Sequence, residues 1–528
     1  MWLARCLLIA GKGSDDNGGR AYITDASVLL DAQLKHGGAA TMEIAYVLLF
    51  ALTFFLLGLL RRVAIRAKTA RTTAHCPHPN SVLGNTLEFI RNRRRFFDWY
   101  TDLLRASPSG TIEASAPPPA ELIGDGLFAA DGRLWSLQRK LASHAFSSRA
   151  LRRFNDGVLA AHLHHRLLPF LDAAAAKGNG GVDLQDALRR FGFDAICHVA
   201  FGVVQSSSSL VQGGAKNDEA LFAAFDAALE ISFRRALTPA TWLRRLTKLL
   251  DVSKSRRLRE AVDVIDRHAF SVLDSKQAAR QIRDGGDPDL LSRFMAAMDE
   301  EEDGGSDLGA MFPNPHAKRR FLRDVVVGFV LAGKDTTSSA LTWFFWLLAA
   351  NTRCDRRVHE EVAAAGDDVK AMHYLHAAIT EAMRLYPPVP FNGRVALADD
   401  VLPSGAAVRE GWHANYSAYA MGRMEEIWGK DCMEFVPERW LGAGGEFVPV
   451  DAARYPVFHA GPRVCLGKEM GYVQMKTVAA AVIRRFRVEV VSPLANMEMP
   501  PAYEMTAMMK MKGGLWVRLV RRPEESAE

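Results

Sequence analysis

A long apolar run near the middle of the chain limits the possible fold more than any other feature. Residues 324–350 read DVVVGFVLAGKDTTSSALTWFFWLLAA, and the polar segment 334–337 interrupts the run at its centre. A charged side chain at the middle of a bilayer is costly, so a transmembrane helix is a poor interpretation of this run. We predict instead a long helix buried inside a large domain, with a polar notch that requires a chemical explanation.

The composition is that of a large globular body and excludes several other classes. The chain has 528 residues, of which 49% are hydrophobic and 24% are charged, as is usual for globular domains. The formal net charge is only +6, and without a concentrated basic face this does not indicate nucleic-acid binding. The six cysteines are scattered without a Cys-x-x-Cys pair. This excludes a disulfide scaffold and the usual structural zinc spacings, and it suits a reducing compartment.

A second apolar run lies closer to the N-terminus and predicts a membrane anchor. Residues 44–60 read IAYVLLFALTFFLLGLL, seventeen positions without a charge, which is the lower limit for a helix that crosses the hydrocarbon core. Five basic residues follow within positions 61–71, whereas only Lys35 lies close on the preceding side. The positive-inside rule then places the chain after Leu60 in the cytosol.

These signals define the expected domain organisation. We interpret residues 1–41 as an extended gene model or a dispensable leader, because Met42 directly precedes the apolar run. A transmembrane signal anchor is expected over 42–60, and a basic, proline-bearing hinge is expected over 61–78. The remaining residues 79–520 form the expected main domain of the chain.

The region between residues 134 and 385 is predicted to be mostly helical, because its apolar residues recur at amphipathic spacing. The expected breaks lie near 178–181, 206–209 and 299–307. Three histidines in this region, His162, His164 and His165, suggest a metal site as one interpretation. Such clusters usually lie on the surface of a helix, and we expect no metal there.

The strongest local signal is a ten-residue segment near the C-terminus. Residues 458–467 read FHAGPRVCLG, which matches FxxGxRxCxG, the haem-ligand loop of the cytochrome P-450 superfamily. The resemblance implies that Cys465 is the axial thiolate ligand of the haem iron, where it pushes electron density onto the metal. The glycines of the motif let the backbone approach the ring, and its arginine pairs with a haem propionate. The other motif residues that the resemblance assigns to haem binding are Phe458, Gly461, Arg463 and Gly467.

Two further segments resemble structural motifs of the same superfamily. Glu381 and Arg384 match ExxR, whose spacing places a carboxylate and a guanidinium on one face of a helix. Residues 435–440 read FVPERW and resemble the PERF element. The resemblance implies that Arg439 completes a network with Glu381 and Arg384 behind the haem. It also implies that these three residues are structural rather than catalytic.

Other residues resemble the family's partners for the haem propionates. Trp135 and Arg139 match the motif WxxxR. Arg394 follows the segment LYPPVP, at a position where the family often supplies another propionate partner. The cofactor that these motifs imply is haem b.

The polar notch gains its explanation from the same resemblance. Residues 332–337 read AGKDTT and resemble the oxygen-activation motif (A/G)GxDTT. The resemblance implies that Gly333 lets the helix open above the iron, that Thr336 hydrogen-bonds the bound oxygen, and that Asp335 relays protons from solvent. A hydrogen-bonded kink, which serine and threonine often produce in helices, is the alternative interpretation. The two interpretations are compatible.

Longer phrases narrow the resemblance to one plant clan. FAADGRLWSLQRK, FVLAGKDTTSSALTWFFW and YAMGRMEEIWGKDCMEFVPERWL resemble the fatty-acid ω-hydroxylases, a clan that includes enzymes oxidising jasmonoyl-isoleucine. The resemblance runs from about Pro79 to Arg518. The substrate-pocket candidates that it implies by family position are Phe329, Val330, Ala332, Thr337, Pro390, Phe391, Asn392, Met505, Thr506 and Ala507.

The chain departs from this clan in two places. Residues 109–126 read SGTIEASAPPPAELIGDG, which is too short for the early strands, short helix and substrate-contacting loop that the family places there. The stretch 358–372 is also abbreviated. We therefore expect a complete haem cradle and a truncated wall of the substrate pocket. Either the gene model skips coding sequence or the protein is impaired.

The apolar anchor and the resemblance together thus imply a single-pass haem-thiolate monooxygenase of the endoplasmic reticulum membrane. Its cytosolic catalytic domain, residues 79–520, is expected to be mainly α-helical with a small β region. It would insert one oxygen atom into a fatty acid or fatty-acyl amide, at or near the ω carbon. Electrons would come from NADPH through a partner NADPH-cytochrome reductase, because the chain contains no GxGxxG motif of its own. One alternative is a hydroperoxide-rearranging haem-thiolate enzyme, which the intact pair Asp335 and Thr336 disfavours. The other is a haem-binding protein with little turnover, because 109–126 is short.

Overall fold

The computed structural model describes most of the chain beyond residue 85. The described residues are 49–50, 53, 58, 86–107, 111–112, 124–177, 181–203, 216–236, 252–280, 289–299, 307–491 and 500–523. The chain divides into two units, residues 1–72 and residues 73–528. Every helix and strand discussed below belongs to the second unit.

Several predictions fall outside the described residues. The extension over 1–41 and the hinge over 61–78 lie outside them, as does the anchor over 42–60 except at four positions. Most of 109–126 and most of the three expected helix breaks lie outside them as well. Among the residues that the structure does describe, no helix is long and apolar enough to cross a membrane.

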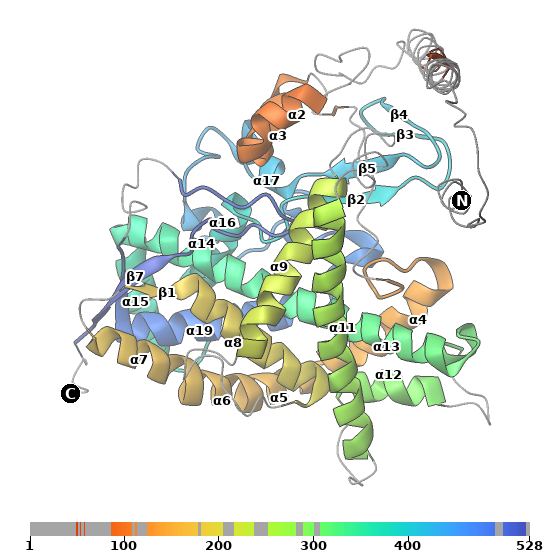
Figure 1. The fold of residues 1–528 in the computed structure, drawn as a ribbon. Coiled ribbons are helices and arrows are strands. Elements are labelled where there is room, and N and C mark those ends of the chain that lie inside the picture. The colour runs from red at the N-terminus through yellow and green to blue at the C-terminus, as the bar shows by residue number, and fades with distance from the viewer. Residues whose placement is uncertain are drawn as a thin grey trace, which may run out of the picture. The chain divides into compact units, whose positions relative to one another are not determined.

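The second unit is mainly helical, which confirms the predicted fold class (Figure 1). Between α5 and α7 the chain continues through two π-helical turns and the short helix α6, so residues 148–176 form one helical path. The helices are α2 (Thr86–Asn92), α3 (Phe96–Ala106), α4 (Gly132–Ser143), α5 (Ser148–Arg153), α6 (Ala160–His162), α7 (Leu168–Ala176), α8 (Leu184–Phe201), α9 (Lys216–Ala236), α11 (Val252–Arg280), α12 (Leu290–Asp299), α13 (Pro315–Lys334), α14 (Thr336–Ala350), α15 (Thr352–Ala365), α16 (His373–Leu385), α17 (Ala418–Met421), α18 (Glu425–Trp428) and α19 (Lys468–Arg485).

The β structure is small and antiparallel. One sheet has the strand order β1-β7-β6, and β1 and β7 lie beside α7 in Figure 1. A two-stranded sheet pairs β2 with β5, so that Asn392 lies opposite Tyr416 and Arg394 lies opposite Ala414. A second two-stranded sheet pairs β3 with β4. The strands are β1 (Val182–Asp183), β2 (Asn392–Val395), β3 (Asp400–Val401), β4 (Ala407–Val408), β5 (His413–Tyr416), β6 (Phe486–Val490) and β7 (Trp516–Arg521).

The apolar run 324–350 is helical and buried, as the sequence predicts, but it forms two helices instead of one. α13 ends at Lys334 and α14 begins at Thr336, with Asp335 between them at φ −103° and ψ −26°. The aromatic residues at 343–345 in α14 are fully buried. The polar notch is therefore the junction between two helices at the centre of the body.

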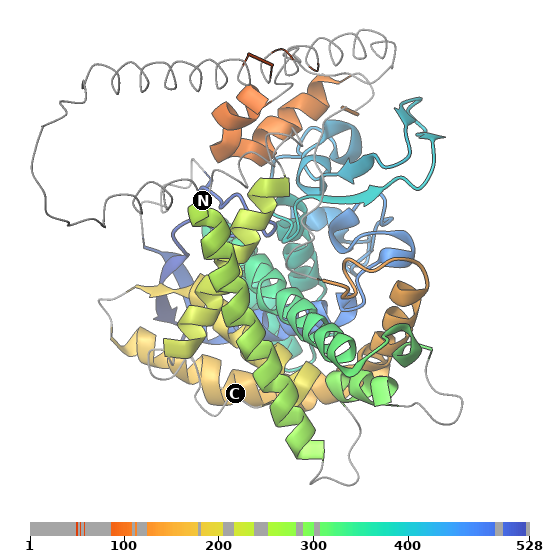
Figure 2. The ribbon, with the colours of Figure 1, turned by 45° about the vertical axis from the view of Figure 1, so that its right-hand side comes forward.

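Two glycines allow α8 to cross α13 closely at this junction. A Cβ atom at Gly333 would lie 2.5 Å from Cγ1 of Ile196 in α8, closer than real Cβ contacts allow. A Cβ atom at Gly192 in α8 would lie 3.2 Å from the carbonyl oxygen of Gly333. Close packing against α8 therefore requires a glycine at position 333. On the other side of the crossing, α9 and α11 run side by side (Figures 1 and 2), and α11 packs against α13.

Two large hydrophobic clusters make up most of the core of the described residues, and a third, small cluster includes Trp428 and Trp440. The first includes residues of α14, α16 and α19, and the second includes residues of α8, α9, α11 and α13. The loop predicted to carry the metal ligand touches both clusters, because Phe458 packs against the first and Leu466 packs against the second. This position lets the packing of both halves of the core fix the loop.

The abbreviated stretch 358–372 still supplies hydrogen-bond acceptors for the N-terminus of the next helix, α16. α15 ends at Ala365, and Gly366 turns the chain at φ 56°. Both carboxylate oxygens of Glu361 then accept the first backbone N–H groups of α16, from Tyr374 and Leu375, at 2.7 Å. A carboxylate at a helix N-terminus satisfies donors that would otherwise lack partners and also interacts favourably with the helix dipole.

Candidate active site

The loop formed by residues 458–467, which we name the cysteine loop, has a constrained backbone. The backbone N–H of Cys465 donates to the carbonyl oxygen of Phe458 at 2.9 Å. Gly461 has φ 69°, and His459 has φ 64°, the only positive φ of a non-glycine residue among those described. A positive φ costs a residue with a Cβ atom roughly 1–2 kcal/mol. The contacts of the His459 side chain must therefore offset this cost.

His459 ties the cysteine loop to the sheet formed by β2 and β5. Its Nδ1 atom lies 2.8 Å from Nδ2 of Asn392 and 2.8 Å from the hydroxyl oxygen of Tyr416. These two partners lie opposite each other in the β2–β5 register. Burial lowers the pKa of His459 to about 4, and the charge of Arg394 acts in the same direction, so the ring is neutral at pH 7. The motif alone did not identify His459, because its partners come from distant strands.

Arg394 lies on the same face of β2 as Asn392, two residues further along the strand. It is exposed, and its Nη1 donates to the carbonyl oxygen of Gly393 at 2.7 Å and to Oδ1 of Asn392 at 3.3 Å. An exposed guanidinium held only by its own strand can still accept an anionic partner. Arg394 therefore places an exposed positive charge near His459 of the cysteine loop.

Two more guanidinium groups lie close to the ring system of Trp135. Arg463 lies 4.4 Å from the centre of its ring system, and Arg139 lies 5.7 Å from it. Nη2 of Arg139 donates to the carbonyl oxygen of Val464, the neighbour of Cys465, at 2.8 Å. Arg463 pairs with Asp131 at 2.5 Å, but that carboxylate is 87% exposed. Such surface pairs contribute little stability, so another carboxylate can replace Asp131.

The thiol of Cys465 is the candidate metal ligand. Burial raises the pKa of this thiol, while the backbone N–H of Gly467 and the charge of Arg139 act in the opposite direction. Among the described residues, no group of three or more His, Cys, Asp or Glu could hold a metal ion. A lone protein ligand suits a metal whose other coordination positions belong to a prosthetic group. The nearby guanidinium groups supply the charge that carboxylates on that group require. This donor set fits haem.

The histidine cluster at 162–165 takes part in packing. His164 and His165 are exposed, as expected for the surface of a helix. The expectation was wrong for His162, which is only 3% exposed and whose Nε2 lies 3.1 Å from Nδ1 of His198 in α8. Burial lowers the pKa of His162 to about 4, with Arg166 and His198 acting in the same direction. The buried His162 and the half-buried His198, from neighbouring helices, thus form a pair in which burial lowers both pKa values.

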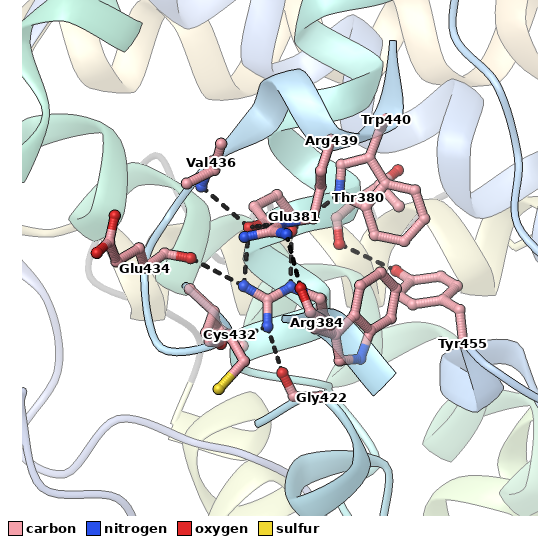
Figure 3. A network of polar contacts seen from close by, with 12 residues as sticks. Thr380, Glu381, Arg384, Gly422, Cys432, Glu434, Val436, Arg439, Trp440 and Tyr455 are labelled. Atoms are coloured by element: carbon pink, nitrogen blue, oxygen red, sulfur yellow. Dashed lines mark hydrogen bonds and ion pairs between the residues drawn. The ribbon is translucent and has the colours of Figure 1, made fainter. Parts of the chain in front are cut away.

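The residues of the ExxR motif form a buried network with Arg439 (Figure 3), which we name the ExxR cluster. Nε and Nη2 of Arg384 donate to the two carboxylate oxygens of Glu381 at 2.7 and 2.8 Å. Nε of Arg439 donates to Oε1 of Glu381 at 2.9 Å. The side chains of Glu381 and Arg384 are fully buried. A buried ion pair of this kind is stable only if every remaining donor and acceptor is satisfied.

Backbone carbonyl groups complete the ExxR cluster. Nη1 of Arg384 donates to Gly422 and, at 2.6 Å, to Cys432, and Nη2 donates to Glu434 at 2.8 Å. With the two bonds to Glu381, all five N–H groups of this guanidinium have acceptors. Nε1 of Trp440 also donates to Glu381 at 2.9 Å. The motifs named three members of this cluster but missed Trp440 and the carbonyl groups.

At the polar notch, Asp335 lies between two cations. Its Oδ1 accepts a bond from Nζ of Lys334 at 2.5 Å and lies 3.5 Å from Nε of Arg189 in α8. The Thr336 hydroxyl donates to the carbonyl oxygen of Ala332 at 2.6 Å. This bond spans the junction between α13 and α14, so the hydrogen-bonded kink is present. The lone pairs of the Thr336 hydroxyl oxygen are left to accept another donor.

The charges around Asp335 extend to a third element. Asp226 in α9 accepts from Nη2 of Arg189 at 3.1 Å and from Nζ of Lys510 at 3.0 Å. Nζ of Lys510 lies 3.6 Å from Oε2 of Glu504. We name this set the notch cluster. Its members are Arg189, Asp226, Lys334, Asp335, Glu504 and Lys510.

Lys334 is the fully buried member of the notch cluster. Its Nζ lies 5.4 Å from the ring centre of Phe222 and 5.7 Å from that of Phe225, both in α9. Burial lowers the pKa of Lys334, although Asp335 acts in the opposite direction. Burial also opposes ionisation of Asp226, but the charges of Arg189, Lys334 and Lys510 lower the pKa of Asp226 overall. The sequence did not indicate these contacts, which join residues of α8, α9 and α13 to the C-terminal segment that carries Glu504 and Lys510.

The substrate-pocket candidates lie in different surroundings. Val330 is fully buried in the second core cluster. Met505 and Ala507 pack against the first cluster, and Asn392 contacts His459 in the cysteine loop. The family position alone therefore does not bring these residues into one pocket.

The fold and the cysteine loop define a class that comparison with known proteins also identifies. Residues 109–515 match the family model described as Cytochrome P450. The chain therefore belongs to the cytochrome P450 family and is a cytochrome P450 monooxygenase. The match extends over both core clusters, the notch and the cysteine loop.

Individual relatives refine this assignment. Cytochrome P450 94B1 of Arabidopsis thaliana is 37% identical over 509 residues, covering 87% of this chain and 94% of the relative. Cytochrome P450 CYP94D108 of Paris polyphylla is 38% identical, covering 83% and 90%. Cytochrome P450 94A2 of Vicia sativa is 36% identical, covering 86% and 93%. These similarities confirm the family, and the plant clan, that the sequence motifs predicted.

Proposed function

We propose that this monooxygenase inserts one oxygen atom from O2 into a fatty acid or a fatty-acyl amide, at or near the ω carbon. The resemblance to the plant ω-hydroxylase clan supports this substrate class. The observation that carries the chemistry is the cysteine loop, where Cys465 lies beside the Gly467 N–H and the Arg139 guanidinium. These two groups would stabilise a thiolate at this position against the cost of its burial.

The residues around Cys465 would hold haem b. Cys465 would be the protein ligand of the haem iron, and Phe458, Gly461 and Gly467 would shape the loop around it. When bound, haem would supply the activation of dioxygen that no amino-acid side chain provides. The propionate partners would be Trp135, Arg139, Arg394 and Arg463.

Asp335 and Thr336 would hold and pass on the protons that dioxygen activation consumes. Asp335 is held by Lys334 and Arg189, so its carboxylate faces α8 and α9 instead of the apolar interior. It would pass a proton toward Thr336, whose hydroxyl oxygen still has lone pairs free. Glu381, Arg384 and Arg439 would have a structural role, because every N–H of Arg384 is engaged within the protein.

We also propose where the enzyme acts and what reduces it. The apolar run over 42–60 and the basic residues after it support a single anchor in the endoplasmic reticulum membrane, with the catalytic domain in the cytosol. NADPH would supply electrons through a partner cytochrome reductase, since the family takes its electrons from a redox partner. The lipid-like substrate would then be available from the same membrane.

Replacement of the proposed ligand tests this function. The variant Cys465→Ala is expected to lose the thiolate-type Soret band of the reduced carbon-monoxide complex and all hydroxylation of lauric acid. The matched control is Cys197→Ala, because Cys197 is also buried but lies in the second core cluster. It should keep both properties. A thiolate-type band in Cys465→Ala would overturn the assignment. A normal band with no oxidised product from fatty acids or fatty-acyl amides would overturn the substrate class alone.

A further inference from the structure

A small cavity lies against Asp335, and charged and polar residues form part of its lining. Its volume is about 20 Å³, and its lining includes all members of the notch cluster except Lys334. The remaining walls come from α8, α9, α14 and the C-terminal segment. About 10–15 Å³ is enough to hold one water molecule, provided that two to four polar groups surround it. The cavity meets both conditions.

The C-terminal segment directs alternate side chains toward this cavity. Residues 503–511 form a hairpin in which Tyr503 bridges Met511 and the N–H of Glu504 donates to the carbonyl oxygen of Lys510 at 2.9 Å. In an extended hairpin, alternate side chains point to opposite faces. Consistent with this, Glu504, Thr506, Met508 and Lys510 line the cavity. The odd-numbered residues from 503 to 511 pack in or against the first core cluster.

One buried donor at the cavity lacks an acceptor. Nε of Arg189 makes no hydrogen bond, although the side chain is only 10% exposed. Its closest charged neighbour is Oδ1 of Asp335, at 3.5 Å. Buried polar groups without a partner are rare, and an ordered water molecule is a common explanation for them. A water molecule in the cavity could accept from Arg189 and donate to Asp335.

The exposure of the notch cluster increases from Asp335 toward Asp226, which is 34% exposed, and toward the C-terminal hairpin. The side chain of Asp335 is 10% exposed, that of Lys510 is 21% exposed, and that of Glu504 is 35% exposed. Glu504 also acts electrostatically on Arg189. The cluster therefore connects the buried notch to solvent through a chain of polar groups.

Two carboxylates could accept protons from solvent, and the contacts distinguish them. Oδ2 of Asp226 accepts from both Arg189 and Lys510, so Asp226 remains an ionised link between cations. Among the described residues, Glu504 forms one ion pair, with Lys510 at 3.6 Å. Glu504 is the carboxylate that can take up and release a proton without breaking the link between α8 and α9.

We propose that Glu504 is the solvent entry point for protons that reach Asp335, and that the cavity holds the water molecule between them. The proposal rests on the proposed role of Asp335 in proton delivery. The Glu504 carboxyl gives a proton to the cavity water, which gives one of its own protons to Asp335. Glu504 then regains a proton from solvent. Lys510 is a positioning residue, because it holds Glu504 over the cavity.

The variant Glu504→Gln tests the proposal in the full-length, haem-loaded enzyme with its reductase and lauric acid. Glutamine keeps the shape of the side chain but cannot relay a proton. We expect about three- to ten-fold less product per NADPH, more peroxide and a larger solvent deuterium isotope effect. This loss is smaller than the 10²–10⁴-fold effect of a direct general acid. Crystal structures of the wild type and the variant should both show a water molecule near Nε of Arg189.

The matched control is Glu489→Gln. Glu489 is 31% exposed and ion-paired, but it lies on β6 and does not line the cavity. It should behave as the wild type. If Asp335→Asn leaks peroxide and Glu504→Gln does not, protons enter elsewhere and this inference fails while the proposed function stands. If neither variant leaks, the proposed role of Asp335 fails as well. A wild-type crystal structure without water in the cavity would also overturn the inference.

Discussion

The ExxR cluster and the notch cluster are both built from arginine and carboxylates, but they differ in how fully their donors are satisfied. In the ExxR cluster, all five N–H groups of Arg384 have acceptors, and its pair with Glu381 is fully buried. In the notch cluster, Nε of Arg189 makes no hydrogen bond, and Lys510 and Glu504 are 3.6 Å apart. A fully satisfied network fixes one arrangement, whereas a partly satisfied one leaves room for water and for rearrangement.

The largest expected effect comes from breaking the satisfied cluster. Glu381→Ala should lower the free energy of unfolding by about 3–5 kcal/mol, because it leaves the guanidinium of Arg384 buried without its counter-charge. Urea unfolding followed by tryptophan fluorescence measures this loss, and soluble yield should fall with it. The comparison with the notch cluster would fail if the loss were below about 1 kcal/mol.

An exposed ion pair provides the control for this loss. Arg353 pairs with Glu438 at 2.6 Å, and its side chain is 68% exposed. Surface pairs typically contribute under about 1 kcal/mol. Arg353→Ala should therefore leave the urea midpoint almost unchanged. An equal loss in both variants would show that burial is not the cause.

The next effect concerns the fraction of NADPH electrons that form product instead of peroxide. Thr336→Ala removes the hydroxyl that donates to Ala332, which should cost only about 1 kcal/mol of stability. Proton delivery should suffer more, with roughly ten-fold more peroxide per NADPH, a change in partitioning that corresponds to about 1.4 kcal/mol. Peroxide assays and haem content separate the two effects. Loss of haem from Thr336→Ala, without any leak from the haem that remains, would assign a structural role to this residue.

A smaller change is expected when the buried cation of the notch cluster is removed. Lys334→Met keeps a long apolar chain against Phe222 and Phe225, and Asp335 still has Arg189 at 3.5 Å. Removing a buried charge also removes its desolvation cost. We expect the free energy of unfolding to change by about 1 kcal/mol or less in urea. A loss as large as that of Glu381→Ala would show that the notch cluster is locked as firmly as the ExxR cluster.

The last effect is a pH dependence near the ExxR cluster. His376 stacks on Phe447 with ring centres 3.8 Å apart, and burial lowers its pKa to about 3, with Lys476 acting in the same direction. The folded state therefore keeps this ring neutral, while the unfolded chain binds a proton below about pH 6.5. This contribution to stability is complete above pH 6.5 and is lost as the pH falls toward 3.

The variant His376→Phe keeps the stacking but cannot titrate. Relative to the wild type, it should gain stability as the pH falls from 6.5 toward 3, and the two should respond alike above pH 7. Urea unfolding at pH 7 and at pH 4.5 measures the difference. The assigned pKa shift would be contradicted if the wild type and His376→Phe lost the same free energy of unfolding between pH 7 and pH 4.5.

The sequence predicted those parts of the site that lie within short segments. Cys465, Glu381 and Asp335 each belong to a motif in which spacing carries the signal. The helical class and the buried central run were also predictable, because they follow from amphipathic spacing and from the cost of a charge in a membrane. The interruption of that run at Asp335 was visible as a polar notch, although not as a break between two helices.

The rest of the site depends on contacts between distant elements. Trp440 donates to Glu381 and the carbonyl of Gly422 accepts from Arg384, but nothing in these residue types marks them as members of the ExxR cluster. Asp226 and Lys510 reach the notch from α9 and the C-terminal hairpin. His162 was expected on a surface, and only the packing of α8 against its helix buries it. Such contacts are set by how helices cross, which spacing along one segment cannot encode.

The position of the cysteine loop between the two core clusters has a consequence for unfolding. Phe458 packs on one cluster and Leu466 on the other, so a group bound at Cys465 is linked to the packing of both halves. A ligand that binds only the folded state adds its binding free energy to stability. Here that free energy would couple the two halves, so that the haem-loaded protein unfolds in one cooperative transition. The haem-free protein should lose the two clusters in separate steps.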